Sequence, residues 1–115
     1  AAAVQALQGL DVWEGLQDRL VRGEGVGQAF QFVAGGSAEL GLVARAQVTG
    51  RGGSSWLLPA NLHDPIEQQL VVLARSHDPD TAERFADFLL QDPEAANLIR
   101  AAGYDLPDPA DAHPR

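Results

Sequence analysis

A glycine-rich turn with the sequence GEGVG, residues 23–27, precedes a stretch with helical apolar spacing. A helix beginning near Val26 exposes backbone N–H groups that lack partners and carry the positive end of the helix dipole, and such groups can bind a small anion. Glu24 would oppose an anion unless its side chain points outward. The turn matches neither the dinucleotide-binding spacing nor a P-loop, which needs Lys followed by Ser or Thr. The alternative interpretation is a plain corner between a strand and a helix.

Other chemistry-bearing residues show no catalytic or metal-binding pattern. His63, His77 and His113 are isolated in the sequence and have neither the H-E-x-x-H motif nor any i, i+4 pairing, so we predict no metal site. Ser37 lies in GGSAE, which is similar to the start of a nucleophile elbow. Glu39, however, stands where the closing glycine of that motif should be, and the expected order is helix then strand. Ser37 is therefore interpreted as a turn residue.

Two acidic pairs have spacings that need no catalytic explanation. Asp64 with Glu67, and Asp92 with Glu94, fit helix capping and solvated faces, so acid–base catalysis is not required to explain them. An α/β enzyme fragment would need a nucleophile–base pair, which the sequence does not offer. We therefore predict that the chain is not an enzyme.

Composition excludes several classes of partner. The 115 residues carry a formal charge of −8, and all eight basic residues are scattered arginines, which argues against nucleic acid and against an anionic membrane surface. There is no cysteine, so disulfides and thiolate chemistry are excluded. The longest apolar runs are far shorter than the roughly 20 residues that span a bilayer, so no direct membrane insertion is expected. Without Met, the opening AAAVQAL cannot be a native translation start, and we expect an upstream segment to have been removed.

Three helices are expected in the first third of the chain. The first covers residues 1–8 and ends with Gly9 as its C′ residue, and Asp11 caps a second, short helix. The third begins at the glycine-rich turn, because apolar residues from Val26 to Val33 follow the spacing of one buried helical face. The sequence AGGSAE then ends this helix.

Three apolar segments predict strands. A short strand is expected around residues 20–22, before the glycine-rich turn. The runs LGLVA, residues 40–44, and QQLVVLAR, residues 68–75, are continuous and bounded by turn signals, as is typical of strands buried on both faces of a mainly parallel sheet. Together with the helices, they indicate an α/β fold.

The last third of the chain predicts two helices joined by a sharp corner. Asp80, three residues before Glu83, resembles a capping box at the start of the first. The second has Asp92 as N-cap, Pro93 at its first position and Gly103 at its end. Residues 107–115 are acidic and Pro-rich, so we expect a disordered tail there.

Three segments, residues 20–48, 54–75 and 82–107, together resemble the carboxyl-terminal part of periplasmic molybdate-binding proteins, the solute receptors of ATP-driven oxyanion importers. The most specific parts run from GEGVGQA through AELGLVA to AQV, with a later W-x-x-P-A followed by PIEQQ. The resemblance implies a partial type II periplasmic-binding-protein fold over residues 1–106. These would form part of the second lobe and the chain's return to the first, with a mainly parallel sheet flanked by helices.

The resemblance also implies a site for a tetrahedral oxyanion, molybdate or tungstate, held between two lobes by neutral donors. Val26 matches the residue whose backbone N–H binds the anion, and Gly25 and Gly27 would let the backbone approach it. A second donor would precede the helix at residues 1–8, and hydroxyl and amide ligands would come from the first lobe. Ala44 stands where some relatives have a Tyr hydroxyl, so no hydroxyl ligand carries over. Beyond the oxyanion itself, no metal or cofactor is expected.

The implied receptor is periplasmic and acts with the membrane permease of an ABC-type importer. This chain alone offers one donor, so we expect it to bind the anion weakly or not at all. Its apolar strands need neighbours, and we expect it to associate with the missing N-terminal lobe or to form a swapped homo-oligomer. A different hypothesis is a ligand-sensing or interaction domain of a larger regulator. What precedes Ala1 would discriminate, because a signal peptide and first lobe mean transport whereas a helix-turn-helix domain means regulation.

Overall fold

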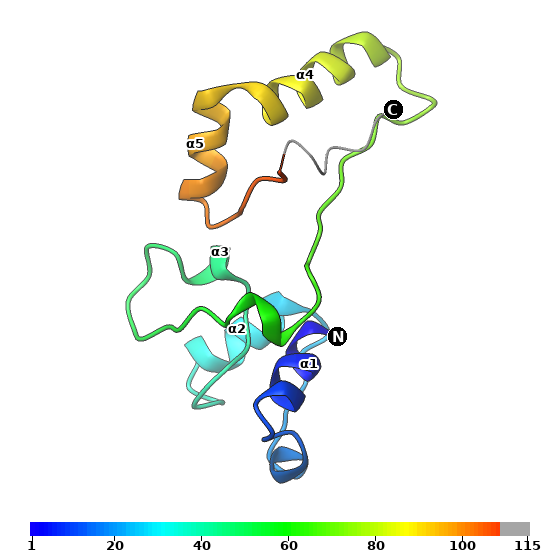
Figure 1. Ribbon diagram of the computed structural model, residues 1–115. Helices are drawn as coiled ribbons and strands as arrows, with labels where there is room; N and C mark the ends of the chain where they lie inside the picture. The colour runs from blue at the N-terminus through cyan, green and yellow to red at the C-terminus, as the bar shows by residue number, and fades with distance from the viewer. Residues whose placement is uncertain (109–115) are drawn as a thin grey trace. The chain divides into compact units, whose positions relative to one another are not determined.

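The computed structural model describes residues 1–108, which divide into two compact units after Glu67. The helices of the first unit are α1 (Ala2–Gly9), η1 (Glu14–Leu16), α2 (Val26–Ala34), α3 (Arg45–Val48) and η2 (Ala60–Leu62) (Figure 1). Those of the second are α4 (Pro79–Gln91) and α5 (Pro93–Ala101). None of the helices in this described part has the length and apolar character needed to cross a membrane.

Helix α1 forms where the sequence predicts it, but its end differs from the prediction. Gly9 is the last helical residue, and Asp11 takes the C′ position instead, with a φ of 59°. The Asp11 N–H donates to the Gln8 carbonyl at 3.0 Å and the Val12 N–H to the Leu7 carbonyl at 3.1 Å, which is a Schellman motif. Aspartate tolerates the left-handed conformation better than most residues. Asp11 therefore ends α1 and does not cap a second helix, and only the short turn η1 follows.

Helix α1 packs against η2 and is hydrogen-bonded to Asp64, two residues after the end of η2. The Gln5 side-chain amide donates to the Asp64 carboxylate at 2.8 Å and accepts from the Asp64 backbone N–H at 3.1 Å. Ala6 is adjacent to Gln5 in the sequence and is fully buried. Helix α1 also contacts η2 directly. Gln5 and Asp64 are 59 positions apart, so these contacts join the beginning and the end of the first unit.

Helix α2 confirms the predicted helix after the glycine-rich turn. It begins at Val26 and ends at Ala34, and Gly36 beyond it has a φ of 77° that favours glycine. The following chain returns close along the helix, because a Cβ at Gly41 would lie 2.5 Å from the Val33 Cγ2. A side chain at position 41 would therefore require Val33 to move where residues 40–44 pass α2.

The predicted parallel sheet is not present in the described part of the chain. Residues 20–22, 40–44 and 68–75 belong to no strand within positions 1–108. A strand exists only where a neighbouring segment accepts and donates its backbone hydrogen bonds, and no described segment lies beside them in that way. The sheet stays a prediction that depends on strands from elsewhere.

The second unit is a corner of two helices whose caps the sequence predicts in part. Asp92 caps α5 as predicted, accepting from the Glu94 and Ala95 N–H groups at 2.9 and 3.0 Å. Gly103 follows α5 with a φ of 95°, as expected for its end. The predicted cap of α4 at Asp80 is wrong. Asp78 caps α4, because Pro79 has the φ of a first helical residue and needs no N–H partner.

The Asp78 cap also has an electrostatic signature. Its carboxylate accepts from the Thr81 hydroxyl at 2.7 Å and from the Thr81 N–H at 3.0 Å. These two bonds favour the charged form and hold the pKa of Asp78 below its ordinary value. Asp80 lies in the first turn of α4, where a carboxylate is favourable beside the helix dipole but makes no cap.

Replacing Asp92 with alanine is expected to lower the free energy of unfolding by about 1 kcal/mol, because two N–H groups of α5 lose their acceptor. Asp92 also ends α4, since its own N–H donates to the Phe88 carbonyl at 3.0 Å, so the loss acts at the corner between the helices. Thermal unfolding followed by circular dichroism measures the change. Asp92→Asn keeps a capping oxygen and should retain most of the stability; equal losses in both variants would contradict the capping role.

Few side chains are buried in either unit. Within residues 1–108, the buried hydrophobic residues are three alanines, Ala6, Ala86 and Ala95. Many large apolar side chains are instead more than half exposed to solvent. They include Val21, Leu40, Trp56, Leu57, Ile66, Val71, Leu73, Phe85 and Leu98. Apolar surface of this extent is typical of a surface that another polypeptide covers.

Candidate anion site at the start of helix α2

The first turn of α2 presents three backbone donors without acceptors. Gly25 is the N-cap, with extended backbone at φ −164° and ψ 175°, and its carbonyl accepts from the Ala29 N–H at 3.2 Å. The N–H groups of Val26, Gly27 and Gln28 precede this first helical bond and have no acceptor within residues 1–108. All three residues are exposed. The helix start can therefore donate to an anion that approaches it along the helix axis.

The three glycines of the turn differ in whether the structure leaves room for a side chain. A Cβ at Gly23 would lie 2.7 Å from the Ala29 nitrogen and 2.9 Å from the Gly25 carbonyl oxygen, so the fold of the turn itself requires glycine there. A Cβ at Gly25 or Gly27 would meet nothing within 4 Å, and neither residue has a positive φ. Nothing in the described chain requires glycine at 25 or 27, and the space beside both is open.

The turn is held against the helix by one side chain. The Gln28 side-chain oxygen accepts from the Glu24 backbone N–H at 2.7 Å. Gln28 occupies the third helical position, from which a glutamine side chain commonly reaches back to the residues before the helix. Since this bond involves only the backbone of Glu24, it leaves the exposed carboxylate of Glu24 free to point into solvent. Glu24 is the one acid in residues 21–33.

A second element, α3, is joined to the start of α2 by Gln47. The Gln47 side chain accepts from the Ala44 N–H at 3.0 Å and donates to the Val26 carbonyl at 3.1 Å. Gln47 was not predicted from the sequence. A partial signal was present, because glutamine at the third helical position can accept from the N-cap N–H even when the N-cap, here Ala44, has no capping side chain.

Two arginines near the site lie over aromatic rings. The Arg51 guanidinium is 5.0 Å from the centre of the Phe30 ring, and Phe30 is one helical turn after Val26. The Arg22 guanidinium is 5.7 Å from the centre of the Trp13 ring. These distances are typical of cation–π contacts. They place positive charge on the side of α2 and on the segment that leads into the glycine-rich turn.

The other candidate residues have structural roles or lie elsewhere. The His63 ring nitrogen Nδ1 is 2.7 Å from the Asp64 backbone carbonyl. Ser37 is exposed in the turn after α2, as predicted. No group of three or more His, Cys, Asp or Glu side chains within residues 1–108 could hold a metal ion. His113 and the rest of the predicted tail from position 109 lie outside the described residues.

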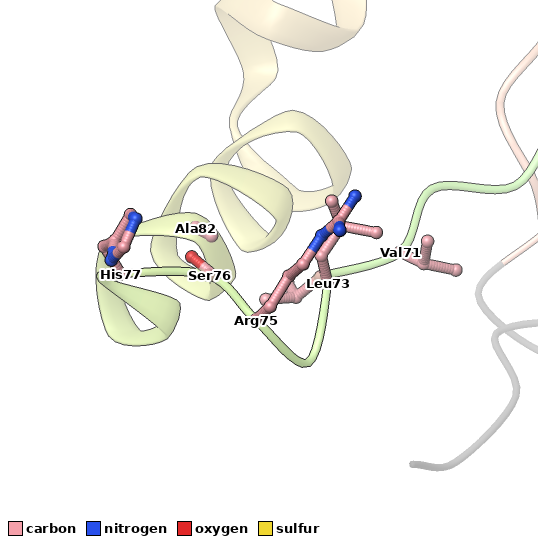
Figure 2. Close-up of a pocket in the computed structure, with 7 residues that line it drawn as sticks. Val71, Leu73, Arg75, Ser76, His77 and Ala82 are labelled. Atoms are coloured by element: carbon pink, nitrogen blue, oxygen red, sulfur yellow. The ribbon is translucent and has the colours of Figure 1, made fainter.

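The second unit has a shallow hollow of about 520 Å³ that offers no comparable site. Apolar residues line most of it, with Arg75, Ser76 and His77 along one edge (Figure 2). Figure 2 shows the side chains of Arg75 and His77 lying apart from each other, on either side of Ser76. The Ser76 hydroxyl accepts from the Asp78 N–H at 3.3 Å. The polar groups of the hollow therefore do not converge on one point.

The start of α2 offers backbone N–H groups without acceptors within residues 1–108, and many apolar side chains of the chain are exposed. Both features fit one part of a solute receptor. The family model of the bacterial extracellular solute-binding proteins matches residues 1–105, and the chain belongs to this family. Membership in a family of solute-binding proteins supports a binding role rather than catalysis.

Relatives within this family include molybdate-binding proteins. The molybdate-binding protein ModA of Rhodobacter capsulatus is 44% identical over 105 residues, which are 90% of this chain and 41% of the relative. The protein of the same name from Azotobacter vinelandii is 44% identical over 110 residues, 92% of this chain and 43% of the relative. The solved structure of the Azotobacter vinelandii periplasmic molybdate-binding protein is similar with a TM-score of 0.82 at 39% identity.

That structural similarity covers 93% of this chain and 48% of the solved chain. It supports a periplasmic-binding-protein fold. The chain thus spans less than half the length of each of these relatives.

Proposed function

We propose that this chain forms part of a periplasmic receptor that binds molybdate or tungstate and delivers it to the membrane permease of an ATP-driven importer. The observation that carries the proposal is the start of α2, where the N–H groups of Val26 and its two successors are exposed and have no acceptor within residues 1–108. Relatives that are 44% identical are named for molybdate binding, which supports the choice of ligand.

In the proposed site, the backbone N–H of Val26 donates to one oxygen of the oxyanion. Gly25 and Gly27 have no side chain beside this N–H, and the space beside both is open within the described chain. A charge-assisted hydrogen bond of this kind contributes about 1.5–3 kcal/mol. The donors are uncharged, so the site distinguishes anions by cavity size and by the number and position of donors.

The proposed site is incomplete in this chain. One helix start offers too few donors to surround a tetrahedral anion, so the remaining donors come from another part of the receptor. We propose that this part is an amino-terminal lobe, because the chain spans only 41% and 43% of the relatives' lengths. The chain alone is expected to bind the anion weakly or not at all. A swapped homo-oligomer is the alternative partner.

The experiment uses a two-part receptor, in which this chain is joined behind the amino-terminal portion of the Azotobacter vinelandii relative. Calorimetric titration with molybdate, tungstate and sulfate is expected to show sulfate binding at least about tenfold more weakly than the larger anions, because donors set for a larger tetrahedron contact a smaller one poorly. The free chain is the control and should release little or no heat. Equal affinity for sulfate and molybdate would overturn the ligand assignment, and no binding of any anion would overturn the proposed function.

A further inference from the structure

We infer that Gln47 is a positioning residue of the anion site, which acts by orienting the peptide group between Val26 and Gly27. The inference rests on the proposed function and names a residue that this function needs beyond the anion donor itself. Gln47 is 21 positions from Val26, and its side chain is half-buried between α3 and the start of α2.

The Gln47 side chain has one defined orientation. Its oxygen accepts from the Ala44 N–H at 3.0 Å, and its nitrogen donates to the Val26 carbonyl at 3.1 Å. Rotating the amide by 180° would place the NH₂ group against an N–H and the oxygen against a carbonyl, so both bonds would be lost. The two partners therefore fix the side chain from opposite ends.

Holding the Val26 carbonyl also orients the N–H of Gly27. The two groups belong to one planar peptide unit and point in opposite directions. The Val26 carbonyl points along the helix, so the Gly27 N–H points out of its first turn, where it has no acceptor within residues 1–108. A donor on the carbonyl side polarises the peptide and strengthens its N–H as a hydrogen-bond donor. Gln47 thereby supports a second donor next to the Val26 N–H.

The segment that carries Gln47 is itself attached to α2 at a second point. A Cβ at Gly41 would lie 2.5 Å from the Val33 side chain, so residues 41–47 pass close to both ends of α2. Contacts at Val33 and at Val26 together determine where α3 lies along α2. The direction of the Gln47 side chain is thus set by packing as well as by its hydrogen bonds.

The test compares Gln47→Ala and Gln47→Met in the two-part receptor, with molybdate as the probe. Methionine keeps the length of the side chain and removes both hydrogen bonds. Each variant is expected to weaken molybdate binding by about two- to tenfold, the range for one lost hydrogen bond. The matched control is Gln31→Ala, an exposed glutamine on α2 with no side-chain hydrogen bond within residues 1–108, and it should leave the affinity unchanged.

Amide NMR separates positioning from a general structural effect. In the parent, molybdate should shift the amide NMR signals of Val26 and Gly27. In Gln47→Ala, the molybdate-induced shift of the Gly27 signal should be smaller, while the signals of the other amides of α2 should match those of the parent. Parent-like affinity in both Gln47 variants, or a parent Gly27 amide that does not respond to molybdate, would overturn the role of Gln47 and leave the proposed function standing. A parent that binds no molybdate would overturn both.

Discussion

Replacing Val26 with proline is expected to weaken molybdate binding to the two-part receptor by about ten- to a hundredfold, the range for one lost hydrogen bond to a charged group. Proline removes the backbone N–H and changes little else at this position. Val26 is the first residue of α2, where proline fits a helix well. The preceding Gly25 is extended, at φ −164° and ψ 175°, as a residue before proline should be. Calorimetric titration measures the loss.

The control for this prediction is Val26→Ala, which keeps the N–H and removes an exposed side chain. Val26 is 58% exposed, so little packing is lost, and affinity should stay within about twofold of the parent. Circular dichroism should show the same helix content in both variants. Parent-like affinity in Val26→Pro would show that the Val26 N–H does not bind the anion.

Replacing Val71 with lysine is expected to abolish association of the free chain with a separately produced amino-terminal portion of the receptor. Val71 is 76% exposed in an apolar segment without helix, residues 70–73, and its burial against a partner would contribute about 1.5–3 kcal/mol. A lysine ammonium at the same point would have to be desolvated without a partner. Size-exclusion chromatography with light scattering measures the complex.

The matched control is Gln69→Lys, which adds the same charge two residues away, at an exposed polar position outside the apolar segment. It should still form the complex. The unmixed chain should self-associate as its concentration rises, because its apolar side chains remain uncovered. A compact monomer at high concentration, or equal complex formation by both lysine variants, would contradict the role of this segment in association.

Helix boundaries that depend on neighbouring residues were predictable. Helix α2 begins at Val26 because the extended Gly25 precedes it and the helical apolar spacing begins there. Helix α5 has its Asp92 cap and its end at Gly103 as predicted, since both depend on bonds that span a few residues. The errors at Asp11 and Asp80 have the same local character. Asp11 forms part of the Schellman motif that ends α1, so it caps no second helix. Helix α4 begins at Pro79 with Asp78 as its N-cap, so Asp80 already lies inside the helix.

Helices α1, α2, α4 and α5, the family and the turn where an anion donor is proposed could be read from the sequence, because caps, glycines and apolar spacing act within about two helical turns. The short helices α3 and η2 were not predicted. The hydrogen bonds between segments far apart in the sequence became visible only in three dimensions. Gln47 is hydrogen-bonded to Val26, which is 21 positions away, and Gln5 is hydrogen-bonded to Asp64, which is 59 positions away. No local sequence pattern predicts contacts between residues so far apart. The predicted sheet depends on strands that the described residues do not supply, because a strand is stable only when other strands satisfy its backbone hydrogen bonds.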